Sequence, residues 1–375
     1  MSTFLWRIFE KVWHFRSTTL GLHWLWPAWR TQYRISFGIW LRVSAENPGC
    51  ERNSSILYRP LLHQNDIRLF VLHPGSDGDI VFGEIEELDW RNGGPFEALS
   101  YVWGDTSDTE IIKIGCADVA VTKSLEAALR QLRYPDRHRT LWVDYLCINQ
   151  SDVSERNQQV AKMGLIYERS QRVLVWLGEA TPDTKVGMDI IQYFASEPRP
   201  QPYPVWQHYP LAVVQAGLAD VMGRPWFQRM WVVQEIGRSR AVVLVCGEHQ
   251  VGWTSSNSYE VRIFSRMIKY AELLPRWTQM GLNVVDFQPL LEMLDVQIGN
   301  QLDRSHGTTH RQAPDILDIA YTMRHKQCKD PRDKVYGVYG VPPHMTVIDA
   351  ERYPVDYRMT TEEVYEALKE LAFRS

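Results

Sequence analysis

The sequence predicts an α/β fold: a largely parallel sheet flanked by helices, with a β-hairpin before it and a mostly α-helical region after it. Two observations lead to this class. Short apolar runs of strand length alternate with amphipathic helical segments between residues 96 and 178, and such alternation builds βαβ units with parallel strands. Earlier in the chain, the turn sequence at residues 74–78 separates two strand-like runs, which is typical of a hairpin.

The predicted strands lie mostly in the first half of the chain. Segments with the length and apolar content of strands are residues 67–72, 80–88, 96–103, 111–114, 119–121, 141–148, 173–177 and 241–246. One of these segments carries Asp144 in its middle, so the sequence predicts a carboxylate inside a buried strand. Carboxyl ends of parallel strands meet at one edge of a sheet, where ligands bind. We therefore expect Trp103, Asp105, Asn149 and Gln150 at that edge.

Helical segments are recognised by their amphipathic period and by their caps. They are residues 124–133, a helix that begins after Asp152, and residues 187–194 and 211–222. Glu155 follows Asp152 by three residues and completes a capping-box pattern, and Arg156 beside it is expected to face solvent. Thr360 and Glu363 repeat the pattern before a last helix, which reaches the end of the chain without a stop signal. We expect relatives to continue farther.

Composition limits the class of partner and the compartment. The 375 residues are 45% hydrophobic and 23% charged, with a net charge of −4, which does not favour a nucleic-acid partner. The five cysteines form no CxxC pair, so we predict no disulfide framework, no metal site and a reducing cytoplasmic location. No apolar run approaches the roughly 20 residues that span a bilayer, so we predict no transmembrane segment.

The chain is predicted to have three parts. Residues 1–55 are rich in tryptophan and arginine. We interpret them as an extension outside the fold, because no stripe of period 3.6 runs through them; the alternative is a membrane-surface helix or an organelle-targeting leader. Residues 56–240 form the main domain, with its core motifs at 97–236. Residues 241–375 form the mostly helical C-terminal region.

Three blocks of sequence resemble the heterokaryon-incompatibility (HET) domain of filamentous fungi. They are FEALSYVWGD at 96–105, the stretch from LWVDYLCINQ to VLVWLG at 141–178, and RPWFQRMWVVQE at 224–235. A fourth stretch, DPRDKVYGVYG at 330–340, is similar to a segment common downstream of that domain. Tyr145 departs from the pattern, since relatives often have a small residue there.

The resemblance implies a role in fungal non-self recognition, an innate-immunity-like response that ends in programmed cell death. It implies self-association and homotypic or heterotypic protein partners in a signalling assembly. HET domains are also distantly similar to TIR domains, some of which cleave NAD with a glutamate on a helix. The alternative function is therefore a TIR-like NAD(P)-cleaving glycohydrolase with NAD as substrate and Glu235 as catalytic acid, stabilising an oxocarbenium-like centre. A third alternative is a degenerate member without death activity.

Each candidate site residue has a functional and a structural interpretation. The candidates for ligand binding are Trp103, Asp105, Asp144, Asn149, Gln150, Arg224, Arg229 and Trp231. The tryptophans can stack on a base or pack in the core. The arginines can neutralise a pyrophosphate or lie at the rim. The carboxylates and amides can orient a ligand or hold turns, caps and ion pairs. Glu235 can equally pair with Arg229 or Arg238.

Overall fold

The computed structural model describes residues 58–63, 65–91, 93–196, 208–254, 265, 268–269, 283, 285–306, 316–342 and 354–372. The chain divides into two units, Met1–Glu51 and Arg52–Ser375, and all the described residues belong to the second unit. The predicted N-terminal extension at 1–55 lies outside the described residues.

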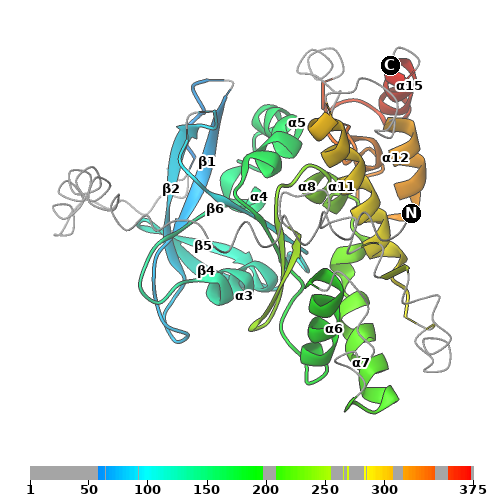
Figure 1. Cartoon of the computed structure of the whole chain (residues 1–375). Helices are drawn as coiled ribbons and strands as arrows, with labels where there is room; N and C mark the ends of the chain where they lie inside the picture. Colours follow the sequence, from blue (N-terminus) through cyan, green and yellow to red (C-terminus); the bar gives the residue numbers. More distant parts are fainter. Residues whose placement is uncertain are drawn as a thin grey trace, which may run out of the picture. The chain divides into compact units, whose positions relative to one another are not determined.

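A single mixed sheet forms the centre of the second unit (Figure 1). Over the described residues it has nine strands in the order β5-β4-β2-β1-β6-β3-β7-β8-β9. The strands are β1 Asp66–Leu72, β2 Phe82–Asp89, β3 Glu97–Tyr101, β4 Thr109–Ile114, β5 Ala117–Thr122, β6 Arg139–Trp142, β7 Val173–Trp176, β8 Val242–Cys246 and β9 His249–Thr254. All five residues of β3 are buried, so the middle of the sheet is covered on both faces.

The sheet is parallel only in part, which corrects the prediction of a largely parallel sheet. Strands β6, β3, β7 and β8 run parallel, as do β2 and β4. The pairs β1–β2, β1–β6, β4–β5 and β8–β9 are antiparallel. The reason lies in the hairpins: tight turns join antiparallel strands, and all the hairpins belong to the same sheet as the parallel core. The sequence predicted the strands of the first two hairpins and β8, but it predicted neither β9 nor the joining of the hairpins to the parallel strands in one sheet.

Helices cover both faces of the parallel core. The helices before β8 are α3 Lys123–Leu132, α4 Asp144–Cys147, α5 Val153–Arg169, α6 Thr184–Ser196, α7 Leu211–Met222, the 3₁₀ helix η3 Pro225–Gln228 and α8 Val232–Gly237. Arg139 of β6 donates a hydrogen bond to the Leu132 carbonyl at the end of α3 (2.7 Å). Trp142 of the same strand packs against Tyr167 of α5 with ring centroids 5.3 Å apart. Side chains three positions apart on a strand point to opposite faces, so α3 and α5 lie on opposite faces.

The predicted strand at 141–148 is wrong in its second half. Strand β6 ends at Trp142, and Asp144–Cys147 form one helical turn, in which the Cys147 N–H donates to the Val143 carbonyl (2.7 Å). Both pieces are apolar and buried, and a short buried run does not distinguish a strand from a helical turn. Asp144 therefore lies just beyond the carboxyl end of β6 rather than inside a strand.

The start of α5 is held by a buried ion pair instead of a full capping box. Asp152 caps the helix by accepting from the backbone N–H groups of Ser154 and Glu155. The Glu155 carboxylate turns to Arg68 on β1, whose guanidinium lies 2.5 Å and 3.1 Å from its two oxygens, and also accepts from the Asn149 N–H at 2.7 Å. Arg68 has no exposed surface. A buried guanidinium needs such partners, because an unpaired interior charge costs several kcal/mol, on the order of 3–5.

The fold continues past residue 240, because β8 and β9 complete the sheet. The described residues after β9 are mostly helical, with α11 Gln288–His306, α12 Ile316–Thr322, the 3₁₀ helix η5 Met323–His325, α13 Asp333–Tyr336 and α15 Thr361–Ala372. The predicted boundary between residues 240 and 241 stays a prediction about domains. Among the described helices, none combines the length and the apolar character that crossing a bilayer requires.

The ion pair beneath α5 gives a first prediction. Glu155→Ala leaves the fully buried Arg68 without its main partner, so we expect it to lower the free energy of unfolding by about 3–5 kcal/mol. Glu87→Ala is the matched control: Glu87 lies 3.6 Å from the same guanidinium, but its side chain is 37% exposed. Exposed pairs contribute little, so we expect a loss below about 1 kcal/mol. Urea denaturation measures both, and equal losses would contradict the assignment.

Candidate functional site

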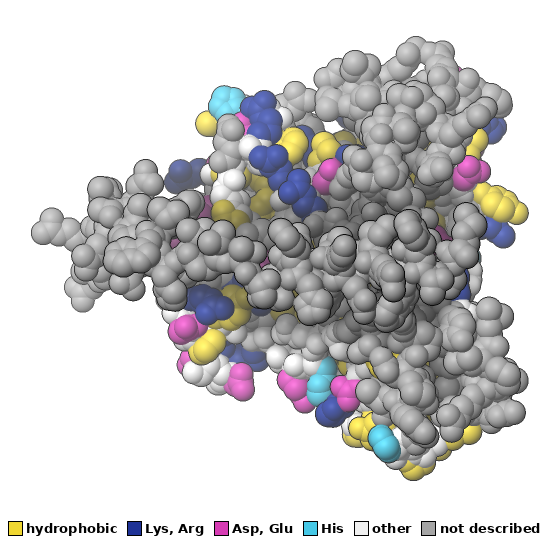
Figure 2. Space-filling view, viewed as in Figure 1, with side chains coloured by type: hydrophobic (Ala, Val, Ile, Leu, Met, Phe, Trp, Pro, Cys, Tyr) yellow, Lys and Arg dark blue, Asp and Glu magenta, His cyan; other side chains and the backbone are white. Residues whose placement is uncertain are grey.

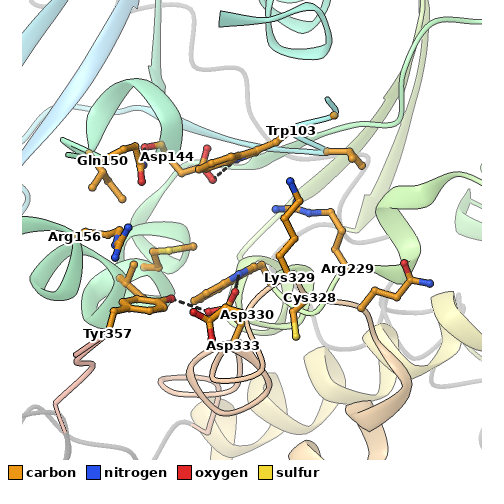
Figure 3. Close-up of a pocket in the computed structure, with 17 residues that line it drawn as sticks. Trp103, Asp144, Gln150, Arg156, Arg229, Cys328, Lys329, Asp330, Asp333 and Tyr357 are labelled. Carbon is orange, nitrogen blue, oxygen red and sulfur yellow. Dashed lines mark hydrogen bonds between the residues drawn. The ribbon is translucent and has the colours of Figure 1, made fainter. Parts of the chain in front are cut away.

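A cavity of about 560 Å³ opens at the carboxyl ends of β3 and β6 (Figure 3). Its lining residues come from several segments: Val102, Trp103 and Gly104 after β3; Asp144, Ile148 and Gln150 after β6; Arg156, Val160 and Met163 on α5; Arg229 and Trp231 beside α8; and Gln327, Cys328, Lys329, Asp330, Asp333 and Tyr357 from later in the chain. Most small-molecule sites are clefts of about 300–1,000 Å³ with a few polar groups in an apolar lining.

The cavity lies where the chain's path over the sheet reverses. After β3 the chain runs through β4 and β5 to α3 on one face, and after β6 it runs through α4 to α5 on the other. The segments that leave these neighbouring strands thus diverge and open a crevice between them, which is where α/β sheets bind ligands. Gly104 has a φ of +76°, a left-handed conformation that glycine adopts without steric cost, and it turns the chain away directly after Trp103.

Trp103 and Asp144 form one wall of the cavity. The Trp103 indole N–H donates to Asp144 Oδ2 (2.9 Å), and the Tyr145 backbone N–H donates to Oδ1 (2.7 Å). The Tyr145 ring meets the Trp103 ring edge-on at 5.4 Å. Burial raises the pKa of the Asp144 carboxyl, while Arg229 and the Trp103 N–H act against this shift. The polar edge of the indole is therefore occupied, and its orientation is fixed.

Glu235 lies in a buried polar cluster behind this wall. It is 1% exposed and is not among the described residues that line the cavity. The Ser100 hydroxyl donates to the Glu235 carboxylate and accepts from the Trp226 indole N–H (2.7 Å). Arg229 Nη1 lies 3.6 Å from Glu235 Oε1 and donates to the Tyr101 carbonyl. Burial raises the pKa of Glu235, opposed by Arg229 and by Ser100.

The opposite wall comes from the segment after residue 325. Asp333 accepts hydrogen bonds from the Trp231 indole N–H (3.2 Å) and the Tyr357 hydroxyl (2.8 Å). Burial raises the pKa of Asp333 from its ordinary 3.8 to about 6, and both hydrogen bonds work against that rise. Backbone hydrogen bonds fix this segment to the block around Met230: the Met230 N–H donates to the Gln327 carbonyl at 2.8 Å, and the Gln327 N–H to the Gln228 carbonyl at 2.5 Å.

Comparison with known proteins identifies the part of the chain that contains β3, β6 and the block RPWFQRMWVVQE at residues 224–235. Residues 96–235 match the family Heterokaryon incompatibility protein (HET). This region is a HET domain. The chain is also similar to Heterokaryon incompatibility protein 6, OR allele, of Neurospora crassa, with 29% identity over 224 residues. That alignment covers 48% of this chain and 33% of the relative. No solved structure matches the chain significantly.

The cavity collects five of the predicted site residues of the HET domain. They are Trp103, Asp144, Gln150, Arg229 and Trp231. Gln150 donates from its side chain to the Asp144 carbonyl (3.0 Å). Whether these residues bind a ligand stays a prediction. The strand-end argument anticipated that Trp103 and Gln150 would lie together; it did not anticipate Asp144, Arg229 or Trp231.

Other predicted residues have structural partners and are not among the described cavity residues. Asp105 accepts from the Ser107 N–H (2.9 Å) and hydroxyl (2.8 Å), which lower the pKa of Asp105. Asn149 accepts from the Ser151 N–H at 3.1 Å. Arg224 pairs with Asp220 at 3.0 Å. Each of these side chains therefore has a partner within the protein, and a role in ligand binding stays a prediction for all three.

Several cavity residues were missed by sequence reasoning. Arg156 was expected to face solvent, yet it lines the cavity and stacks on the Tyr357 ring at 4.7 Å. Lys329, Asp333 and Tyr357 come from outside the matched HET region. The stretch DPRDKVYGVYG was a signal for Asp333, because it resembles a segment common downstream of HET domains. Nothing in the sequence around Tyr357 points to the site.

The buried cluster gives a second prediction. Ser100→Ala removes the hydroxyl that joins the Trp226 N–H to the Glu235 carboxylate and leaves both without that partner. We expect the free energy of unfolding to fall by about 1–3 kcal/mol, the usual cost of an unsatisfied buried polar group. Ser154→Ala, on the exposed side of α5, should change it by less than about 0.5 kcal/mol. Urea denaturation compares the two variants, and a neutral Ser100→Ala would refute the role given to the hydroxyl.

The raised pKa of Asp333 gives a third prediction. Because its folded-state pKa is about 6 against an ordinary 3.8, folded protein binds this proton more tightly than unfolded protein. The stability that this group contributes is present at low pH and is lost as pH rises from about 4 to about 6, on the order of 3 kcal/mol. Asp333→Asn mimics the protonated state. Its stability relative to the wild type should therefore increase between about pH 4.5 and about pH 7.5.

Asp330→Asn is the control. Arg332 lowers the pKa of Asp330 below its ordinary 3.8, so the stability that ionised Asp330 contributes is fully present above about pH 4 and is lost only as pH falls below that value; the cost of its replacement should therefore stay nearly constant between about pH 4.5 and about pH 7.5. Urea denaturation of both variants at each pH measures the two trends. A difference between Asp333→Asn and the wild type that does not change with pH would mean that Asp333 titrates normally.

Proposed function

We propose that this chain acts in fungal heterokaryon incompatibility: its HET domain takes part in non-self recognition and sets off regulated cell death through self-association and contacts with protein partners. The observation that carries the proposal is the match of residues 96–235 to the HET family. The similarity to the incompatibility protein of Neurospora crassa supports it. The aligned region spans 33% of that relative, so the activity of the whole relative extends to this chain only as part of the proposal.

Features of the described surface are compatible with assembly through protein contacts. Strand β5 lies at one end of the strand order, and an edge strand offers unpaired backbone groups to another chain. Ile111 on the neighbouring strand is 49% exposed. Figure 2 shows acidic, basic and hydrophobic side chains interspersed over the described part of the visible face. We place this action in the cytoplasm, in keeping with the free thiols of Cys116, Cys147, Cys246 and Cys328.

The second candidate is a TIR-like fold that cleaves NAD. It is favoured by the position of the cavity at the ends of parallel strands and by its lining with Trp103, Trp231 and Arg229. Glu235 reaches this cavity only through Arg229, 3.6 Å away, so the acid would act by positioning that cation. Unlike Glu235, Asp144 of the HET domain lines the cavity directly.

The fourth prediction tests the proposed role in living cells. The full chain is expressed from an inducible promoter in a filamentous fungus as two copies with different tags. We expect viability to fall on induction and the two tags to precipitate together. Normal growth with abundant, folded protein would contradict the proposal. The remaining interpretation would then be a family member that does not cause cell death.

The same cultures separate the two candidates when cellular NAD is measured in parallel with the variant Glu235→Gln. This change keeps the size of the side chain, and it keeps an oxygen that can accept the hydrogen bond from the Ser100 hydroxyl. If the domain signals through contacts, NAD stays constant on induction and the variant stays toxic. If it cleaves NAD, wild-type cells lose NAD and the variant spares both NAD and viability. Circular dichroism of the purified variant checks that it is folded.

A further inference from the structure

We propose that the cavity binds a phosphorylated nucleoside, with the base against Trp103 and the phosphate at Arg229 and Lys329, and that the segment after the HET match completes this site. The inference does not depend on the role in incompatibility, since it rests on the chemistry of the cavity walls.

The first step concerns the aromatic rings, whose polar edges are already bonded. The Trp103 N–H is held by Asp144, and the Trp231 N–H and the Tyr357 hydroxyl are held by Asp333. Figure 3 shows Trp103 on the opposite side of the cavity from Tyr357 and Asp333. Hydrogen bonds at the rim restrain each ring, so a flat ligand can contact the face of Trp103 without disturbing those bonds. The Tyr357 ring already carries the guanidinium groups of Arg156 at 4.7 Å and Arg332 at 5.3 Å, so it supports the lining cation Arg156. Stacking of a base on an aromatic side chain is worth about 1–3 kcal/mol.

The second step concerns the charges, which are unequally satisfied. The lining carboxylates have partners: Asp144 and Asp333 accept the bonds described above, and Asp330 pairs with Arg332 at 2.6 Å. The cations are less well matched. Over the described part of the chain, Lys329 has no carboxylate within ion-pair distance, and Arg156 Nε is buried without a hydrogen-bond partner. Lys329 and the Arg156 Nε are therefore left for an anionic ligand, whereas Arg229 already lies 3.6 Å from Glu235.

The arrangement of the cations favours a ligand that is charged at one end and flat at the other. Figure 3 shows Arg229 and Lys329 together on one side, with Arg156 and Gln150 across from them. Arg229 is held by the Tyr101 carbonyl and by Glu235, so it is preorganised to meet a phosphate. Gln150 uses its amide N–H on the Asp144 carbonyl (3.0 Å), which directs its amide oxygen to accept from an amino group of a base. The volume of about 560 Å³ admits a molecule of this size.

The third step concerns the origin of the walls. Trp103, Asp144 and Arg229 belong to the matched HET region, whereas Lys329 and Tyr357 come from later in the chain. The two parts also meet beside the cavity, where Asn157 donates to Asp356 (3.0 Å) and accepts from the Tyr357 N–H (3.3 Å). A ligand that contacts both walls stabilises their association, because binding to the assembled state alone shifts the equilibrium toward it. The nucleotide would thus regulate how firmly the downstream segment is held.

The fifth prediction tests this site with the purified full-length chain. Isothermal titration calorimetry and thermal denaturation are run with AMP, GMP, ADP, adenosine and inorganic phosphate. We expect at least one nucleotide to bind and raise Tm, with an affinity about tenfold or more above that of adenosine or phosphate alone, since both ends of the ligand contribute.

Variants identify where the nucleotide binds. Lys329→Ala should weaken nucleotide binding by about tenfold or more, because it removes a cation from the phosphate. Arg156→Ala and Tyr357→Leu act at the other end of the cavity, where Arg156 stacks on the Tyr357 ring, and should weaken binding of the nucleotide and of adenosine alike. Lys369→Ala, an exposed lysine of α15 that is 59% exposed, is the control and should bind as the wild type does. Because Lys329 is exposed, its replacement should leave the fold intact, which circular dichroism checks.

Three results would overturn the proposal. One is folded protein that binds none of the nucleotides with Kd below about 1 mM. Another is nucleotide binding that Lys329→Ala and Arg156→Ala leave unchanged. The last is phosphate or adenosine that binds as tightly as the nucleotides. None of these results bears on the viability assay, so failure of the site and failure of the incompatibility role remain distinguishable.

Discussion

The carboxylate of Glu235 joins the block at residues 224–235 to β3, beside the middle strand of the sheet, and the geometry of the cavity depends on that junction. Placing a carboxylate in the interior costs several kcal/mol unless it is hydrogen-bonded and paired. Ser100 and Arg229 provide these partners from two different elements. Removing the carboxylate would therefore release the serine, the arginine and, through the serine, the indole of Trp226. Arg229 in turn lines the cavity, and it is held there by the Tyr101 carbonyl of β3 and by Glu235 of α8.

Charge links the buried cluster to the cavity wall. Asp144 and Glu235 both interact with Arg229, and the charge of Asp144 also raises the pKa of Glu235. One guanidinium cannot neutralise two carboxylates, so the cluster keeps a negative charge unless a proton is taken up. The raised pKa values of both carboxyl groups reduce that imbalance. Titration of this cluster is a property of the group rather than of one residue.

The sequence could predict local elements and strand ends better than long-range neighbours. The helix at 211–222 was predicted with its observed bounds, because its ends are marked by Pro210 and Gly223. The prediction of a strand over residues 141–148 was wrong in its second half, since apolar content alone does not separate a strand from a buried helical turn. Trp103 and Gln150 could be grouped in advance because ends of parallel strands meet, whereas Asp144 was expected inside a strand. Arg156 and Tyr357 could not, because their meeting depends on a contact across 201 positions of the chain, 357 minus 156.

The blocks that carry the HET resemblance are also contact partners, which gives those motifs a physical meaning. In FEALSYVWGD, Ser100 and the Tyr101 carbonyl receive Trp226 and Arg229 of RPWFQRMWVVQE. The Trp103 indole N–H donates to Asp144 of the middle block. Buried indole and guanidinium donors must find acceptors, so a change in one block would leave a donor unsatisfied in another. Most motif residues thus hold the domain together, and a smaller set at the strand ends faces the cavity. A substitution in these blocks therefore acts on the fold first and on the site second, unless the side chain lines the cavity.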